Sequence, residues 1–337
     1  MTSNIKMDRR SVLAALGSAG LGLAAAGSAL VYGWESDDNS LNSILPNFTD
    51  KARETLSRVT NAPGYSGQIP AAKVKELMDL EGKDIDALMV GLLPLGRTYA
   101  RPPISQFFVG AVARGVSGNL YFGGNVEFAG MSLGSTVHAE QAALSNAYMH
   151  SDTGVSTIAV TAVPCGHCRQ FMSELSPDGQ IGILLEGKSP VKLSSMLPMG
   201  FGRKDMGFKG GAFPVKEVDL ALSDATSDEL LEAALKAARK SYARYTGAPA
   251  GVALATQSGR IYKGSYIETA AFNPSLSPLQ IALVGMIVAG EDYSAIRRVT
   301  LAEVKGARIS QRDVTDAVLR EVAPAVQLQV SNISRRS

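Results

Sequence analysis

Residues 110–129 read GAVARGVSGNLYFGGNVEFA, and residues 251–270 read GVALATQSGRIYKGSYIETA. The two stretches align without a gap at a shift of 141 residues, and seven of 20 positions are identical, where average composition would give about one or two. The identical pairs are Gly110/Gly251, Ser117/Ser258, Gly118/Gly259, Tyr121/Tyr262, Gly123/Gly264, Glu127/Glu268 and Ala129/Ala270. We therefore predict two copies of one α/β unit, joined near residues 209–211.

The two copies differ in the residues that could do chemistry. With one residue deleted, the match continues and places Pro278 against His138 and Gln280 against Glu140. No His or Cys follows Cys168. The second copy therefore cannot repeat a site built from such residues, and we expect it to be an inactive packing partner.

Apolar periodicity and turn residues place the secondary structure of each copy. A helix is expected before each repeat, near Asp84 and near Asp228, the second opened by a Thr226–Glu229 capping box. The elements expected in the first copy are helices within 47–99 that open near 69–70 and at Asp84, strands at 107–114 and 119–128 that turn at Gly118–Asn119, a helix at 141–150, a buried strand at 156–163 and a helix at 169–175. This alternation predicts a three-layer α-β-α fold with a mixed sheet, internally duplicated, with a degenerate second copy.

Composition excludes several classes of protein. The chain has 337 residues, 45% hydrophobic and 19% charged, with a net charge of +2. Such a balance, with 6% aromatic residues, argues against a nucleic-acid partner. Two cysteines cannot form a disulfide scaffold.

The N-terminal segment is predicted to be a targeting signal rather than part of the fold. Lys6, Arg9 and Arg10 precede residues 11–34, which carry no charge. Paired arginines before a mildly apolar run are typical of a twin-arginine export signal. A membrane anchor formed by residues 11–34 and a misassigned start codon are the alternatives.

All soft metal ligands lie in one window of the sequence. The three His and two Cys fall within residues 138–168. His138 opens one expected helix, and Cys165 and Cys168, after Pro164, open another, where the helix N-terminus favours thiolate. Three ligands of N and S type describe a catalytic zinc site with one open position. Zinc lowers the pKa of bound water, and Glu140 lies near enough to His138 to move that water's proton.

The remaining histidines of the window are not expected to bind the metal. His167 as a fourth ligand would strain the turn between the two cysteines. We expect His150 to be a surface residue or a helix C-cap. Arg169 is a candidate to pair with a thiolate and tune the metal's charge, with an ordinary surface ion pair as the alternative.

The window carries the His-x-Glu…Pro-Cys-x-x-Cys signature of zinc nucleobase deaminases. The sequence resembles the zinc-dependent cytidine/deoxycytidylate deaminase family, and within it the long, dimeric bacterial and plant type. The resemblance covers residues 45–325. The matching segments are 107–115, 124–128, 138–144, 164–172, 197–202 and 273–280.

The resemblance implies a reaction and a metal. His138, Cys165 and Cys168 would hold one zinc per chain, and Glu140 would be the proton shuttle, donating to N3 while zinc-bound hydroxide attacks C4. Cytidine and 2'-deoxycytidine would yield uridine and 2'-deoxyuridine plus ammonia, in pyrimidine salvage. The family also implies a homodimer and a cytoplasmic location. The export-like N-terminus argues against the cytoplasmic location.

The resemblance also implies a set of substrate-binding residues. Asn125, Val126 and Glu127 would contact the nucleoside, with the ribose hydroxyls bonded by Asn125 and Glu127. Phe107 would stack on or flank the pyrimidine, and Phe201 would reach a neighbour's site across the dimer interface. The chain departs from the family at Arg203, where Pro is usual after Phe-Gly, and this puts the placement of the Phe201 loop in question.

Three alternative functions remain to be separated. The first is a thiol oxidoreductase, since Cys-Gly-His-Cys is also a motif of that class. The second is a deaminase that acts on a polynucleotide or modified cytosine with the same metal site, and the third is a non-catalytic module that keeps zinc for stability.

The sequence predicts four segments. They are a signal or anchor at 1–34, a linker and helical segment at 35–83, the catalytic zinc domain at 84–208 and the inactive repeat at 212–330.

Overall fold

The computed structural model describes residues 40–176, 180–222 and 226–336. The predicted export signal or anchor at 1–34 lies outside these residues. Among the described residues, no helix combines the length and apolar character needed to cross a bilayer.

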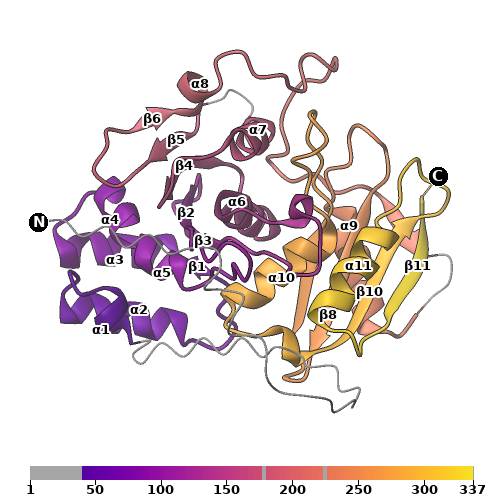
Figure 1. The fold of residues 1–337 in the computed structure, drawn as a ribbon, viewed down its shortest axis with the longest axis horizontal. Helices are drawn as coiled ribbons and strands as arrows, with labels where there is room; N and C mark the ends of the chain where they lie inside the picture. Colours follow the sequence, from indigo (N-terminus) through magenta and orange to yellow (C-terminus); the bar gives the residue numbers. More distant parts are fainter. Residues whose placement is uncertain (1–39, 177–179, 223–225, 337) are drawn as a thin grey trace, which may run out of the picture. The chain divides into compact units, whose positions relative to one another are not determined.

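The first copy is a six-stranded sheet with helices on both faces (Figure 1). The strands run in the order β1-β3-β2-β4-β5-β6, and the pairing is antiparallel except between β4 and β5. The elements are α1 (Leu41–Ile44), α2 (Asp50–Thr60), β1 (Gln68–Ile69), α3 (Ala71–Glu81), α4 (Ile85–Gly91), α5 (Leu93–Arg97), β2 (Gly110–Gly115), β3 (Leu120–Gly124), η1 (Leu133–Ser135), α6 (Ala139–Met149), β4 (Val155–Val160), α7 (Gly166–Leu175), β5 (Gly182–Leu184), β6 (Val191–Lys192) and α8 (Leu193–Met196).

The second copy repeats this arrangement. Its sheet has the order β7-β11-β10-β8-β9, and the parallel pair is β10 with β11. The elements are β7 (Leu220–Leu222), α9 (Glu229–Arg239), β8 (Ala250–Thr256), β9 (Ile261–Ser265), α10 (Pro278–Val288), η2 (Tyr293–Ala295), β10 (Ile296–Val304), α11 (Arg312–Val322) and β11 (Leu328–Arg335). The order β9-β8-β10-β11 mirrors β3-β2-β4-β5, so the predicted duplication is confirmed.

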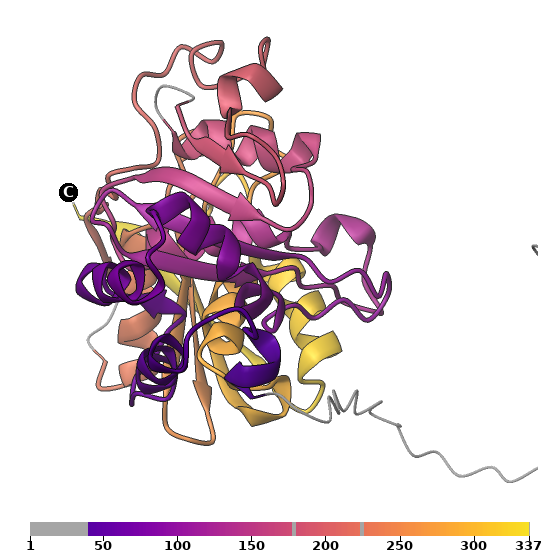
Figure 2. The same ribbon diagram turned by 90° about the vertical axis from the view of Figure 1, so that its left-hand side faces the viewer.

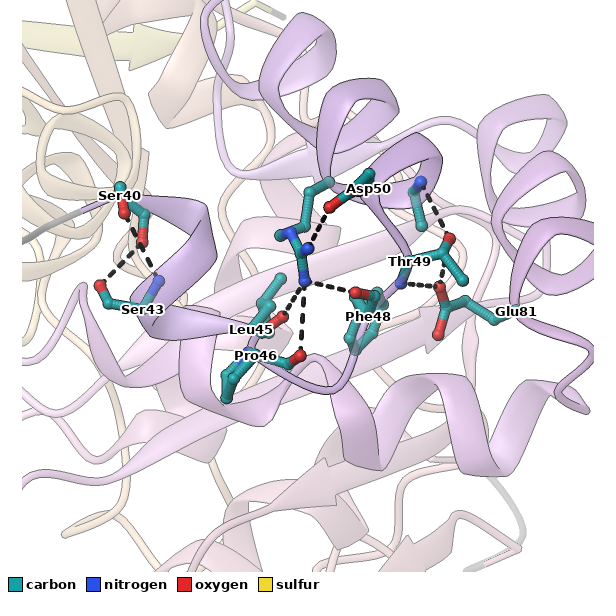
Figure 3. Close-up of polar contacts among 10 residues, drawn as sticks. Ser40, Ser43, Leu45, Pro46, Phe48, Thr49, Asp50 and Glu81 are labelled. Carbon is teal, nitrogen blue, oxygen red and sulfur yellow. Dashed lines mark hydrogen bonds and ion pairs between the residues drawn. The ribbon is translucent and has the colours of Figure 1, made fainter.

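The N-terminal helices cover one face of the first sheet and face the viewer in Figure 2. Thr49 caps α2, and its backbone N–H and hydroxyl both donate to the Glu81 carboxylate, at 2.7 and 2.9 Å (Figure 3). Arg53 donates to three carbonyls of the segment before α2, those of Leu45, Pro46 and Phe48. These contacts fix the helices that follow the predicted linker.

The largest apolar core belongs to both copies at once. It joins α6 and α7 with α10 and α11, and it includes inward residues of both sheets, such as Ile158 and Val299. The four helices therefore form a shared layer between the two sheets. Two smaller clusters lie under the N-terminal helices and under α9.

The structure corrects the alignment of the two copies after the repeat. α6 and α10 are equivalent helices of 11 residues each. A Cβ added at Gly123 would meet the carbonyl oxygen of Ala139, the first residue of α6, and a Cβ added at Gly264 would meet that of Pro278, the first residue of α10. The shift is therefore 139 residues here, so two residues are deleted rather than one. Ser277, not Pro278, stands where the first copy has His138, and Leu279, not Gln280, where it has Glu140.

Element boundaries also differ in places from the prediction. The cap of α9 is Asp228, which accepts from the N–H of Leu230, and Thr226 instead accepts from the N–H of Asp228. The Thr226–Glu229 capping box was therefore wrong. The Gly118 turn is confirmed by its positive φ of 84°. The strands are shorter than predicted, because residues 125–128 leave the sheet to bridge Arg101 and Val137.

Candidate active site

The three predicted metal ligands come together at the ends of two helices. His138 is the N-cap of α6, Cys165 is the N-cap of α7, and Cys168 is in the first turn of α7. The Cys165 sulfur lies 3.5 Å from His138 Nδ1 and 3.7 Å from the Cys168 sulfur. One donor atom from each residue falls within 4.8 Å of the others.

This donor set suits a tetrahedral zinc ion. Zn–S and Zn–N bonds of about 2.3 and about 2.05 Å at tetrahedral angles separate two sulfurs by about 3.8 Å and a sulfur from a nitrogen by about 3.6 Å. Two of the three observed separations, 3.7 and 3.5 Å, match these values, and the third, between His138 and Cys168, is within 4.8 Å. With three protein ligands, one coordination position stays open for water or substrate.

The electrostatics of the cluster favour the thiolate form of Cys165, the exposed cysteine. Hydrogen bonds with Cys168 and His138 lower the pKa of Cys165 to about 3. The same hydrogen bond with Cys165, followed by burial, raises the pKa of Cys168. The pKa of His138 is raised, chiefly by its hydrogen bond with Cys165. Thiolate at a helix N-terminus is the form that binds metal.

Glu140 is a buried carboxyl group beside the ligands. It lies in the first turn of α6 with 4% of its surface exposed. Burial raises its pKa, while the charge of His138 and a hydrogen bond with Cys168 oppose that rise. A carboxyl with an elevated pKa suits proton transfer near neutral pH.

Asn125 and Val126 hold the edge of the site in place. The Asn125 amide donates to the Phe107 carbonyl and accepts from the Val109 N–H, each at 2.9 Å. Val126 is buried and exchanges backbone hydrogen bonds with Val137, the residue before His138. Val126 therefore links this segment, which lies beyond the end of β3 rather than on the predicted strand, to the segment before His138, and Asn125 links it to the segment that carries Phe107.

Glu127 organises the loop that precedes Phe107. One carboxylate oxygen accepts from the N–H groups of Ile104 and Ser105, each at 2.9 Å, and the other accepts from the Ser105 hydroxyl at 2.5 Å. Glu127 also lies close enough to His138 for its charge to raise the pKa of the imidazole.

The second copy repeats the Glu127 arrangement in Glu268. Its carboxylate accepts from the N–H groups of Tyr245 and Thr246 and from the Thr246 hydroxyl. Glu268 is therefore a structural hydrogen-bonding group in the second copy.

The two predicted aromatic contacts are available at the surface. Phe107 is 61% exposed and Phe201 is 49% exposed. The Phe201 carbonyl accepts from the Gln170 side chain on α7. Arg203 is buried and donates to the carbonyls of Ser173 and Ser176 at the end of α7, so it fastens the Phe201 loop to the helix that carries the cysteines.

The remaining residues of the ligand window take other roles. His150 is the C-cap of α6 and bonds the Asn146 carbonyl and Ser66. His167 stacks on His138, with ring centroids 5.3 Å apart. Arg169 donates to the carbonyls of Pro164 and Met196.

Three exposed apolar residues lie close in the chain to residues of the site, and no pattern in the sequence indicated their exposure. Leu133 precedes His138, Val163 precedes Cys165, and Met199 precedes Phe201; their exposed fractions are 73, 50 and 95%. A single apolar residue in a loop carries no periodic signal, so only the structure shows that these side chains are exposed.

Known proteins resemble the chain over most of its length. Models of the "cytidine and deoxycytidylate deaminase zinc-binding region" match residues 86–181 and 193–316. A protein named cytidine deaminase from Serratia proteamaculans (strain 568) is 43% identical over 283 residues, 84% of this chain and 94% of that protein. One of the same name from Cronobacter sakazakii is 46% identical over 256 residues, 76% of this chain and 86% of that protein. A crystal structure of cytidine deaminase from Mycobacterium tuberculosis is 28% identical over 34% of this chain and 96% of that chain, with a TM-score of 0.32.

Proposed function

Because the chain belongs to the cytidine and deoxycytidylate deaminase family, we propose that it hydrolyses cytidine and 2'-deoxycytidine to the uridines and ammonia. The observation that carries this proposal is the cluster of His138, Cys165 and Cys168 with the buried Glu140 beside it. One zinc per chain occupies that cluster. The reaction serves pyrimidine salvage.

The residues of the site divide the chemistry between them. Zinc, when bound, supplies a Lewis acid that lowers the pKa of water toward neutrality. Glu140 takes the proton of the attacking water and delivers it to N3 as the water oxygen bonds to C4. Glu140 then carries the second water proton to the leaving amino group, the C4–N4 bond breaks, and ammonia departs.

The nucleoside is held by Phe107, Asn125, Val126, Glu127 and Phe201. The 61% exposure of Phe107 supports its stacking on the pyrimidine. A carboxylate has about four lone-pair positions, and the loop occupies three of those on Glu127, so one remains for a ribose hydroxyl. One lone pair of the Asn125 carbonyl oxygen is likewise left after its bond with Val109.

The active form is a homodimer in which Phe201 approaches the neighbour's site. The 49% exposure of Phe201 leaves its ring available to such a neighbour. Sedimentation is expected to give about twice the mass of one 35.4 kDa chain. A monomer with full activity would contradict the dimer.

Residues 1–34 act as a twin-arginine export signal. Expressed in a bacterium with that pathway, the protein is expected in the periplasm, and Arg9→Lys with Arg10→Lys is expected to retain it in the cytosol. Identical distribution of both forms would contradict the signal.

A metal-dependence assay tests the proposed reaction. Purified protein is expected to release ammonia from cytidine, to lose activity with a zinc chelator, and to recover it when zinc is returned. A short cytosine-containing oligonucleotide and a disulfide-reduction assay serve as controls for the two alternative enzymes. Activity on either control, without activity on cytidine, would overturn the proposal.

A further inference from the structure

Two buried glutamines occupy equivalent places in the two copies. Gln141 is the third residue of α6, and Gln280 is the third residue of α10. Each side-chain oxygen accepts from the backbone N–H of its own helix cap, His138 at 3.1 Å and Ser277 at 2.9 Å. Each side chain therefore has its NH₂ group left to donate.

Both NH₂ groups donate across the boundary between the copies. Gln141 donates to the Pro274 carbonyl at 3.0 Å, and Gln280 donates to the Ser135 carbonyl at 2.5 Å. Pro274 and Ser135 are themselves equivalent, since they differ by the same 139 residues as the helices. The contact is thus reciprocal, as at a two-fold axis between α6 and α10 (Figure 1).

The reciprocal contact holds the segment that carries the metal-binding imidazole. Ser135 lies three residues before His138, and the chain between them pairs with Val126. Gln280 fixes the start of this segment, and Gln141 fixes its end at the His138 N–H. A buried donor or acceptor that loses its partner bears its full desolvation cost, so the segment is strongly held.

A second buried contact reaches the helix that carries the cysteines. Glu174, on α7, is 1% exposed and accepts from the hydroxyls of Tyr242 at 2.7 Å and Tyr245 at 2.6 Å. Its other oxygen accepts from the Ala270 N–H at 3.0 Å. All three donors belong to the second copy.

Glu174 fixes the position of α7 from the end opposite the metal cluster. A buried carboxylate is tolerated only where hydrogen bonds replace its water, so α7 can slide or rotate only by breaking these bonds. Cys165 and Cys168 begin the same helix and would move with it.

We propose that the catalytically silent copy tunes the metal centre of the other copy, with Gln280 and Glu174 as positioning residues. Gln280 sets the backbone that presents His138, and Glu174 sets the helix that presents the thiolates. The second copy has Ser277 and Leu279 in place of the ligand and the shuttle, yet it has Gln280 in place of Gln141. This pattern is expected if Gln280 serves the first copy's site. The inference rests on the proposed zinc site, but not on the identity of the substrate.

Zinc affinity in Gln280 variants tests the proposal. Gln280→Met removes both hydrogen bonds at similar volume, whereas Gln280→Glu keeps an acceptor for the Ser277 N–H and in its ionised form has no donor for Ser135. Both are expected to weaken zinc retention against a competing chelator by about 10–100-fold, as for other groups that orient metal ligands. Both are also expected to shift the visible absorption of the cobalt-substituted protein. Neither readout needs substrate, so a failure here is distinct from a failure of cytidine turnover.

Ser265→Ala is the matched control, because Ser265 is fully buried and donates to the Ala237 carbonyl wholly within the second copy. It is expected to lower thermal stability without changing zinc retention or the cobalt spectrum. If Gln280→Met behaves as this control does, the proposal is overturned.

Tyr245→Phe is the second variant and covers the case in which the Gln280 variants do not fold. It removes one donor to Glu174 and leaves the ring in place. It is expected to shift the cobalt spectrum and to speed zinc loss. An unchanged spectrum and an unchanged rate of zinc loss would overturn the role of Glu174.

Discussion

At the scale of single residues, Glu140 is the most decisive test of the chemistry. Glu140→Gln keeps the size of the side chain and removes its ability to take a proton. We expect kcat for cytidine to fall by about 10²–10⁴-fold with zinc still bound, because Glu140 is not one of the three ligands. Steady-state kinetics with elemental analysis check both points. A variant that keeps kcat within a few-fold would contradict the shuttle role.

Substitution of a metal ligand should give the opposite result for zinc, which is lost rather than retained. His138→Ala removes the only imidazole of the donor set and leaves two sulfurs, so zinc is expected to be lost together with activity. Elemental analysis after dialysis measures the loss. His167→Ala is the control, because His167 stacks on His138 without joining the cluster. One zinc per chain in His138→Ala would overturn the ligand set.

His150 predicts a pH dependence of stability. Burial lowers its pKa, its Nδ1–H donates to the Asn146 carbonyl, and its Nε2 therefore accepts from Ser66 in the neutral form. Lys240 and the Tyr121 ring also face it. Because the folded-state pKa lies below that of the unfolded chain, the stabilisation is present above about pH 6.5 and is lost as pH falls below it.

Denaturant unfolding of His150→Gln between pH 7.5 and 5 checks this prediction. The variant is expected to lose less stability than the wild-type chain as the pH falls over this range. Equal losses in the two proteins would contradict it.

At the scale of elements, Gly123 allows β3 to approach α6. A Cβ there would lie 2.2 Å from the Ala143 nitrogen and 2.6 Å from the Ala139 carbonyl oxygen, both backbone atoms. Gly123→Ala is therefore expected to destabilise the fold by about 1–3 kcal/mol or more and to weaken zinc binding, since α6 begins at His138. Thermal unfolding and chelator competition measure the two effects.

Gly182→Ala is the control for this substitution. Gly182 lies on β5 of the same sheet, and its Cβ would meet Thr157 at 3.5 Å, an ordinary contact. It is expected to be nearly neutral. Equal destabilisation by both changes would show that the close approach of β3 and α6 is not the cause.

The elements also show what the sequence could and could not predict. The candidate metal ligands and the helices that open at Asp84 and after Pro164 follow from local patterns, because ligand spacing and caps act over a few residues. The duplication follows instead from identities repeated at a shift of 141 residues. The end of β3 at Gly124 and the two-residue deletion depend on contacts between distant segments, such as Val126 with Val137. The hydrogen bonds of Arg203 to the end of α7 could not be predicted either, because they form only in the folded chain.

At the scale of the whole molecule, zinc stoichiometry tests the asymmetry of the copies. Ser277 and Leu279 replace the ligand and the shuttle in the second copy, so we expect one zinc per chain in the wild-type protein. Elemental analysis against protein concentration measures it. Two zinc ions per chain would contradict the degenerate repeat.

Removal of residues 1–34 is expected to leave cytidine turnover unchanged, because the site is built from residues 101–203 and their contacts with the second copy. The kinetics of the truncated and full chains, measured side by side, check this. A truncated protein that folds but is inactive would contradict a targeting function for the segment.

The shared helical layer has a consequence for proteolysis. Between Leu197 and Asp219 the chain has no helix or strand, and its glycines make it a natural point of attack. A protease that cuts there severs the backbone but not the common interior of α6, α7, α10 and α11. The two fragments should co-elute as one particle and keep their zinc, and separate only when that interior unfolds.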